Sequence, residues 1–224
     1  MPPPEPHINA SFLSYYTAAV PALRQNARGE ATRELILQTA ERLFAERGIA
    51  AVPLRDIGIA AGQKNNVAVQ YHFGDREALV REVARYRAAF VDTLLSDLMA
   101  GRKAMVIREH VRTFVRSMAR NLEEDNHYLG FLSRYLIEQG GYAGLDAAVS
   151  KETIAKLREI MYRTLPDLPE QVIEERWEVM MTTAVHTLAR YHKAMQAGTL
   201  PAPLDELLED LERFLTAGLE APAR

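Results

Sequence analysis

Residues 54–80 read L-R-D-I-G-I-A-A-G-Q-K-N-N-V-A-V-Q-Y-H-F-G-D-R-E-A-L-V, and this stretch decides the fold. Its first apolar residues, Leu54, Ile57 and Ala61, recur at helical spacing. Gly62 follows them, and glycine is the residue that best tolerates a left-handed helix end. A second buried surface is expected after the turn, at Val67, Val69 and Phe73. The stretch therefore predicts two short helices around a tight turn, a helix-turn-helix.

Helical periodicity extends in both directions from this stretch. Upstream, residues 32–47 predict an amphipathic helix closed by Gly48, whose apolar face carries Ile36, Ala40, Leu43 and Phe44. Downstream, a long helix is expected after Asp75, to about residue 100, followed by helices near 104–122, 128–138, 145–164, 170–197 and 204–219. No alternating strand pattern bounded by turn signals is found, so the predicted class is all-α.

Composition excludes several classes of protein. The chain has 224 residues, of which 48% are hydrophobic and 25% charged, as in an ordinary globular protein. The absence of cysteine excludes disulfides, thiolate metal sites and cysteine nucleophiles. No run of apolar residues is long enough for a transmembrane helix, and the N-terminus does not read as a secretory signal.

The charge is unevenly distributed along the chain. The net charge is −3, but residues 24–87 hold 11 Arg and Lys against 8 Asp and Glu, a balance of +3 that leaves −6 for the rest. A small surplus of arginine is often only a solvated helix face. Its coincidence with the helix-turn-helix nevertheless supports a nucleic-acid partner.

A helix that reads the major groove needs exposed donors and acceptors on one side and buried anchors on the other. Val67 and Val69 are the predicted anchors. The exposed set is Lys64, Asn65, Asn66, Ala68 and Gln70. Amides suit the N6 and N7 edge of adenine, lysine suits guanine or a phosphate, and an alanine methyl suits thymine. For Lys64 and Asn65 a simple polar turn is an equally good interpretation.

The chain resembles the TetR family of transcriptional regulators in three segments. They are T-R-E-L-I-L-Q-T-A-E-R-L-F-A-E-R-G at 32–48, L-R-D-I-G-I-A-A-G at 54–62 and Y-H-F-G-D-R-E-A-L at 71–79. The resemblance implies a three-helix DNA-binding head, a long connecting helix and a larger helical domain for ligand binding and dimerisation. It further implies a cytoplasmic homodimer on a double-stranded DNA operator, released by a small-molecule inducer, with no cofactor or metal.

The expected division is an N-terminal extension at 1–27, a helix-turn-helix domain at 28–75 and a ligand-binding and dimerisation domain at 76–224. The extension begins proline-rich and then carries an apolar and aromatic patch interrupted by Pro21. It is either a short helix on the body or a frayed arm from which Arg24 and Arg28 reach phosphate.

Phosphate contacts are expected at helix N-termini, where unpaired N–H groups face an anion. Thr32 with Arg33, and Asp75 with Arg76, mark two such places, with Thr32 and Asp75 as N-caps first. The resemblance adds Tyr71 and His72 as backbone contacts, whereas Phe73 is expected in the core.

Two positions depart from the family pattern. Ten residues separate Gly62 from Phe73 where the family has nine, so the turn carries one extra residue. The pattern therefore does not fix which side chain enters the groove first. Val52 and Pro53 stand where paired threonines are common, which removes a capping hydroxyl, and Arg55 is expected to compensate.

The C-terminal helices carry two further sets of expected residues. Bulky, adaptable side chains are either plain core or the lining of a ligand site for an apolar or aromatic molecule. This set is Met105, Phe114, Met118, Tyr128, Phe131, Tyr135, Trp177, Met180, Met181 and His186, with His110 and His186 as polar groups for the ligand. The predicted dimer interface is Met180, Thr187, Leu204, Leu208, Leu211 and Leu215, although an apolar stripe is core by default.

Enzymatic function is not expected, because the six histidines show no metal-ligand spacing and no phosphate loop or nucleophile elbow occurs. The sequence therefore predicts a DNA-binding regulator, most simply a repressor. The alternative is a helical module that binds a ligand or partner and keeps the head only as a scaffold.

Overall fold

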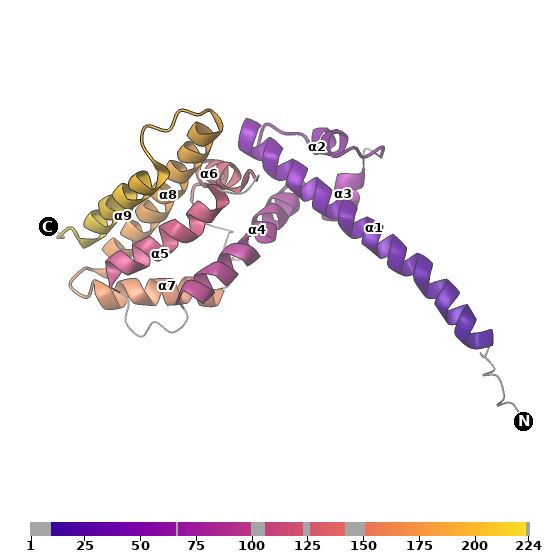
Figure 1. The fold of residues 1–224 in the computed structure, drawn as a ribbon, viewed down its shortest axis with the longest axis horizontal. Coiled ribbons are helices and arrows are strands. Elements are labelled where there is room, and N and C mark those ends of the chain that lie inside the picture. The colour runs from indigo at the N-terminus through magenta and orange to yellow at the C-terminus, as the bar shows by residue number, and fades with distance from the viewer. Residues whose placement is uncertain (1–9, 66, 100–105, 123–125, 142–150, 223–224) are drawn as a thin grey trace, which may run out of the picture.

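The computed structural model describes residues 10–65, 67–99, 106–122, 126–141 and 151–222; for 10–28, 88–99 and 151–157 only the backbone is considered (Figure 1). The N-terminal helices are α1 (Ala10–Arg47), α2 (Leu54–Ala60), α3 (Ala68–Phe73) and α4 (Arg76–Met99). They are followed by α5 (Ile107–Ala119), a 3-10 turn η1 (Arg120–Leu122), α6 (Tyr128–Gln139), α7 (Lys151–Thr164), α8 (Glu170–Gln196) and α9 (Leu204–Glu220). No strand occurs in these ranges, which confirms the all-α prediction.

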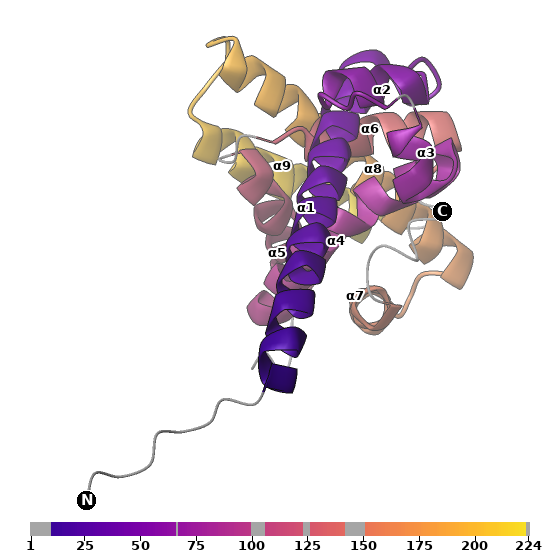
Figure 2. The same cartoon turned by 90° about the vertical axis from the view of Figure 1, so that its right-hand side faces the viewer.

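The head consists of the second half of α1, α2, α3 and the start of α4, which lie together between the C-terminal helices and the projecting half of α1 (Figures 1 and 2). Its core is built from the predicted apolar faces, and Phe44 and Ile57 are fully buried within it. The other buried residues of the head include Ile36, Leu37, Ala40, Leu43, Val69, Leu79 and Val83. The three-helix head is therefore the one expected from the sequence.

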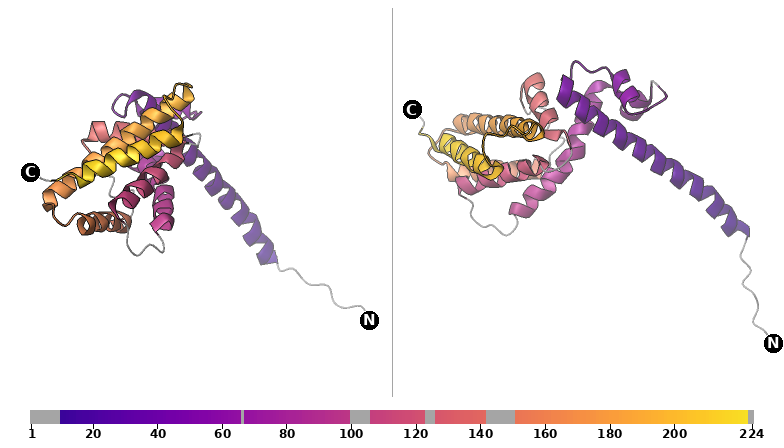
Figure 3. Two further views of the ribbon diagram at one scale, coloured as in Figure 1. Left: turned by 60° about the vertical axis from the view of Figure 1, so that its left-hand side comes forward. Right: turned by 45° about the horizontal axis from the view of Figure 1, so that its top comes forward.

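The first helix is longer than predicted. A helix beginning at Thr32 was expected, but α1 begins at Ala10 and passes through Pro21, and its N-terminal half projects away from the other helices (Figures 1 and 3). Residues 22–31 are rich in Ala, Arg, Gln and Glu, which are good helix formers, so a helix that starts upstream continues into the head. The prediction of a helix N-terminus at Thr32 is wrong for this reason.

The C-terminal helices follow the predicted ranges closely, and residues 145–150 of the expected seventh helix lie outside the described residues. Helices α8 and α9 lie side by side, and α5 packs against α9 (Figure 3). Helix α6 lies between the head and the rest, packed on α1 and on α8. Across the described residues, no helix combines the length and apolar character that crossing a membrane requires.

The apolar core is continuous between the two parts of the chain. Phe44 of α1 and Phe131 of α6 are both fully buried, and their ring centroids lie 6.2 Å apart. All buried apolar residues of the head belong to the same cluster as those of α5, α6, α8 and α9. A displacement of α6 is therefore expected to affect the packing of the head.

Candidate DNA-binding face and ligand-binding core

The turn between α2 and α3 is closed by backbone hydrogen bonds. Gly62 has a φ of +67°, a left-handed conformation that glycine adopts without strain, as the sequence predicts. Its N–H donates to the carbonyl of Ile59 at 3.0 Å, and the N–H of Gln63 donates to the carbonyl of Gly58 at 2.9 Å. A Cβ at Gly58 would lie 3.4 Å from a methyl of Val69, so α2 and α3 are in close contact.

Helix α3 has one buried face and one exposed face. Val69 and Phe73, four residues apart, are 1% and 8% exposed and anchor the helix in the head. On the other side, Tyr71 is 85% exposed. Gln70 beside it is also exposed, and the half-buried positions are Ala68 and His72, the latter packed edge-on to the ring of Tyr71. A hydrogen-bonding amide and a phenol thus face solvent from a short helix held by an apolar anchor.

The residues before α3 form a polar turn. The Oδ1 atom of Asn65 accepts a hydrogen bond from the N–H of Val67 at 3.1 Å, and Lys64 is exposed. Asn66 lies outside the described residues. Val67 is 52% exposed, so its prediction as an anchor is wrong. The reason is its spacing: Val67 is two residues from Val69, and residues two apart do not share a helix face.

The N-terminus of α4 is capped as predicted. The Oδ1 atom of Asp75 accepts a hydrogen bond from the N–H of Ala78 at 2.7 Å. The next residue, Arg76, is turned toward the loop after α1, where its Nη1 donates to the carbonyls of Ile49 at 2.5 Å and Ala50 at 3.2 Å. Arg76 therefore holds α4 against that loop, and its predicted phosphate contact remains a proposal.

Replacing Asp75 with alanine is expected to lower the free energy of unfolding by about 1 kcal/mol, because the N–H of Ala78 loses its acceptor. Urea unfolding followed by circular dichroism measures this. Asp167→Ala, at an exposed turn position, is the matched control and should change stability by less than about 0.5 kcal/mol. Equal effects of the two substitutions would show that the cap contributes nothing.

Thr32 and Arg33 lie within α1, where Arg33 contacts other parts of the head. Because Thr32 lies inside α1, it is not at a helix N-terminus, and the predicted phosphate site there has lost its basis. Arg33 forms an ion pair with Glu82 of α4, and its guanidinium lies 5.2 Å from the ring centroid of Phe73. Arg55, in contrast, is exposed on α2.

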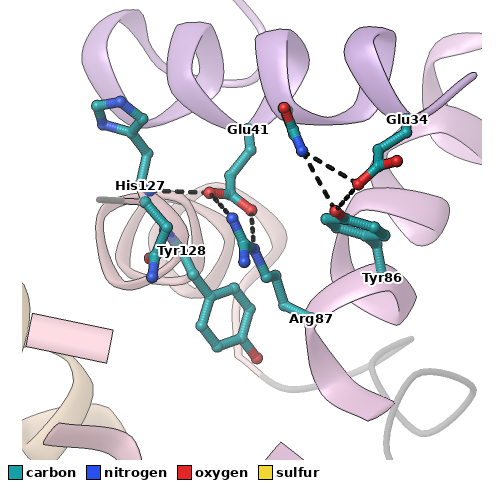
Figure 4. Close-up of polar contacts among 8 residues, drawn as sticks. Glu34, Glu41, Tyr86, Arg87, His127 and Tyr128 are labelled. Carbon is teal, nitrogen blue, oxygen red and sulfur yellow. Dashed lines mark hydrogen bonds and ion pairs between the residues drawn. The ribbon is translucent and has the colours of Figure 1, made fainter. Parts of the chain in front are cut away.

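Glu41 joins three helices at the junction of head and core (Figure 4). It is 1% exposed, and its carboxylate accepts hydrogen bonds from the Nε of Arg87 on α4 at 2.7 Å and from the backbone N–H of His127, just before α6, at 2.8 Å. Burial, followed by the charge of Glu41, raises the pKa of the adjacent Tyr128. A buried carboxylate with these donors fixes the relative positions of α1, α4 and α6.

The other end of α6 is also attached to the head. The carboxylate of Glu138 accepts hydrogen bonds from the N–H of Ile49 at 3.0 Å and of Ala50 at 2.8 Å. Between the two ends, a Cβ added at Gly130 would lie 3.0 Å from the Cβ of Ala45, so only glycine allows this approach without a shift. Sequence reasoning missed Glu41 and Glu138 because their partners lie 46 to 89 residues away, beyond any local spacing signal.

Most of the bulky residues expected around a ligand are buried in the C-terminal helices. This holds for Phe114, Met118, Tyr128, Phe131, Tyr135, Trp177 and Met180, whereas Met181 and His186 are half-buried and Met105 lies outside the described residues. The buried members share one apolar cluster but lie in different parts of it: Trp177 packs near His110, and Tyr128 lies at the junction with Glu41. His186 lines a separate cleft.

His110 on α5 is the one buried polar side chain with no partner among the described residues. It is 1% exposed, and neither ring nitrogen has a hydrogen-bond partner. Its ring centroid lies 6.0 Å from that of Trp177. Burial lowers its pKa from 6.5 to about 4, so the imidazole is neutral at pH 7. A neutral imidazole offers one donor and one acceptor, and such groups are rarely left unsatisfied in a protein interior.

The residues predicted for the dimer interface are largely used within the chain. Met180, Leu208, Leu211 and Leu215 are buried in the single chain, and Thr187 and Leu204 are half-buried. The large apolar side chains that α8 and α9 expose are instead Val179 at 54% and Phe214 at 67%. The four buried residues pack inside their own subunit, where a side chain has little area left for a partner, and the dimer interface stays a prediction.

Two family models match the sequence. The model described as "Bacterial regulatory proteins, tetR family" matches residues 36–83, and the one described as "Tetracyclin repressor-like, C-terminal domain" matches residues 108–218. No curated protein sequence matches the chain.

Solved structures share the fold. A TetR family transcription regulator from Marinobacter aquaeolei VT8 superposes with a TM-score of 0.53 at 17% identity, over 87% of this chain and 97% of that one. The fatty acid degradation regulator FadR from Bacillus halodurans gives a TM-score of 0.57 at 16% identity, over 85% and 97%. A gamma-butyrolactone receptor described as ArpA-like gives 0.50 at 21% identity, over 84% and 98%.

Proposed function

Because the chain belongs to the TetR family of transcriptional regulators, we propose that it is a repressor that binds its operator as a homodimer and releases it when a small molecule binds the C-terminal helices. The observation that carries the DNA-binding part is the exposed face of α3, where Gln70 and Tyr71 stand opposite the buried Val69 and Phe73. Two such helices about 34 to 36 Å apart enter successive major grooves of a near-palindromic site. Such a regulator acts in the cytoplasm, where the bacterial chromosome lies.

In this proposal each side chain near α3 has a defined role. Gln70 reads a base edge, and Ala68 contacts a thymine methyl. Phosphate contacts that position the head come from Tyr71, His72, Arg55 and Arg76. The turn before α3 adds further DNA contacts from Lys64, Asn65 and Asn66. Arg33 acts indirectly, through its ion pair with Glu82.

The inducer we propose is a neutral molecule with an aromatic or aliphatic body and one hydrogen-bonding group. Its support is His110, a neutral and unpartnered imidazole beside Trp177, with Phe114 and Met118 on the same helix. One structural neighbour is named as a gamma-butyrolactone receptor, and a lactone of that kind is a neutral compound with hydrogen-bonding oxygens. The ligand would favour a different position of α6, which Glu41 and Glu138 connect to the head.

Selection from a random duplex library, followed by gel-shift titration of the enriched sequence, tests the DNA-binding proposal. We expect Gln70→Ala combined with Tyr71→Ala to weaken specific binding at least about tenfold, because one good base contact contributes about 1 to 3 kcal/mol. Binding by the unsubstituted chain should also weaken steeply with salt.

Gln171→Ala, at an exposed position of α8, is the control and should bind as the unsubstituted chain does. If no sequence is enriched, or if the double substitution leaves affinity unchanged, the helical module that keeps its head as a scaffold becomes the better explanation.

A further inference from the structure

A cleft lies between α1, α6 and α8, and His110 is not among the residues that line it. Its volume is about 600 Å³, within the range of small-molecule sites. Helix α6 contributes Ser133, Arg134 and Ile137, and α8 contributes His186, Arg190 and Lys193. Ala45 and Glu46, near the end of α1, complete the lining on the side of the head.

The charge around this cleft is strongly one-sided. Arg134, Arg190 and Lys193 are exposed at its lining, and within the described part of the chain none of them forms an ion pair. The acidic residue of the lining, Glu46, is paired with Arg42 at 3.4 Å. Cations that line one cleft raise the local concentration of anions, and arginine suits carboxylate and phosphate oxygens in particular.

The interior of the cleft combines polar and apolar surface. The Oγ of Ser133 lies 2.6 Å from the Nδ1 of His186, which joins α6 to α8 and leaves the Nε2 of that ring for other contacts. Ala45, Gly130 and Ala189 supply small apolar surface, and the side chain of Ile137 is 64% exposed. The apolar body of a ligand would cover Ile137, and its charged group would contact Arg134 and Arg190.

We propose that this cleft binds a small anion with an apolar body, in which a carboxylate or phosphate group contacts Arg134 and Arg190. The site is separate from the one proposed around His110, so either can exist without the other. Because Ala45 and Glu46 belong to α1, an occupant would bridge the C-terminal helices and the head at their junction.

Isothermal titration calorimetry on the full chain at constant ionic strength tests the site with hexanoate, uncharged hexanamide and inorganic phosphate. The variant is Arg134→Gln with Arg190→Gln, and the matched control is Arg163→Gln, an exposed arginine on α7. We expect hexanoate to bind at least tenfold more tightly than hexanamide, and the double variant to lose at least tenfold in affinity while the control loses none. Phosphate binding that is lost in the same double variant would also support the site. It would show that the charged group is sufficient for binding without an apolar body.

Several results would overturn the proposal. The first is that neither hexanoate nor phosphate binds. The second is that the double variant binds them as tightly as the unsubstituted chain does. The third is that hexanoate and hexanamide bind equally and phosphate does not bind. His110→Leu separates the two sites: anion binding that persists in this variant supports the cleft, whereas binding abolished by it assigns the ligand to the core.

Discussion

Replacing Glu41 with alanine is expected to lower the free energy of unfolding by about 3 to 5 kcal/mol, the cost of breaking a buried ion pair by removing one partner. The carboxylate is 1% exposed and accepts from Arg87 and from the N–H of His127. Without this carboxylate, the charge of Arg87 loses this counter-ion and the N–H of His127 loses its acceptor. Urea unfolding at neutral pH, followed by circular dichroism, measures the change.

Glu46→Ala is the control, because Glu46 lies on the same helix but is exposed and paired with Arg42 at 3.4 Å. Its effect should stay within about 1 kcal/mol. Glu41→Gln keeps the shape and one acceptor oxygen, and we expect it to be less damaging than alanine. A loss below about 1 kcal/mol for Glu41→Ala would contradict the role of this residue in joining α1, α4 and α6.

The same variants test how the C-terminal helices are coupled to the head. If α6 communicates with the head through Glu41, then Glu41→Gln should retain operator binding but respond less to an inducer that shifts α6. Gel-shift titration with and without a compound identified by thermal shift gives both quantities. Equal responses of the variant and the unsubstituted chain would place the coupling elsewhere along the continuous core.

His110 is expected to make the folded chain sensitive to acid. In the unfolded chain its pKa returns to the ordinary 6.5, whereas in the folded chain burial lowers the pKa to about 4. The unfolded state therefore binds the proton first, and stability is lost as the pH falls from about 6.5 to 4, by up to about 3 kcal/mol. At pH 7 the imidazole is largely neutral in both states, so this loss of stability is absent.

His110→Leu should remove that pH dependence. It should also raise stability at pH 7 by about 1 to 3 kcal/mol, because an unsatisfied buried polar group is replaced by an apolar one. Free energies of unfolding of the two chains at pH 7 and pH 4.5 measure both effects. Parallel pH profiles would show that His110 does not titrate as its burial implies.

The ligand response distinguishes a functional His110 from a structural one. If the imidazole binds the inducer, His110→Leu is more stable yet shows no thermal shift with a compound that stabilises the unsubstituted chain. A retained thermal shift would place the inducer away from His110, while the DNA-binding proposal would stand.

Local patterns in the sequence determined the helices, because a helix is stabilised by bonds and side-chain spacings within a few residues. The stripe of α2, the glycine turn at Gly62 and the cap at Asp75 are of this kind, and all three are present. The sequence underestimates the length of α1 because Pro21 suggests a break, whereas the helix continues through it among good helix formers.

Only the tertiary structure decided which of these residues face solvent, which face one another and which are left unpartnered. In the structure Val67 is exposed, Arg76 binds the loop after α1, and His110 is buried with no hydrogen-bond partner among the residues that the structure describes. The tertiary structure also brought Glu41 to Arg87 and His127, and Arg134 to the cleft it shares with Arg190. These contacts join residues far apart in the chain, and their geometry depends on how whole helices pack rather than on any local spacing.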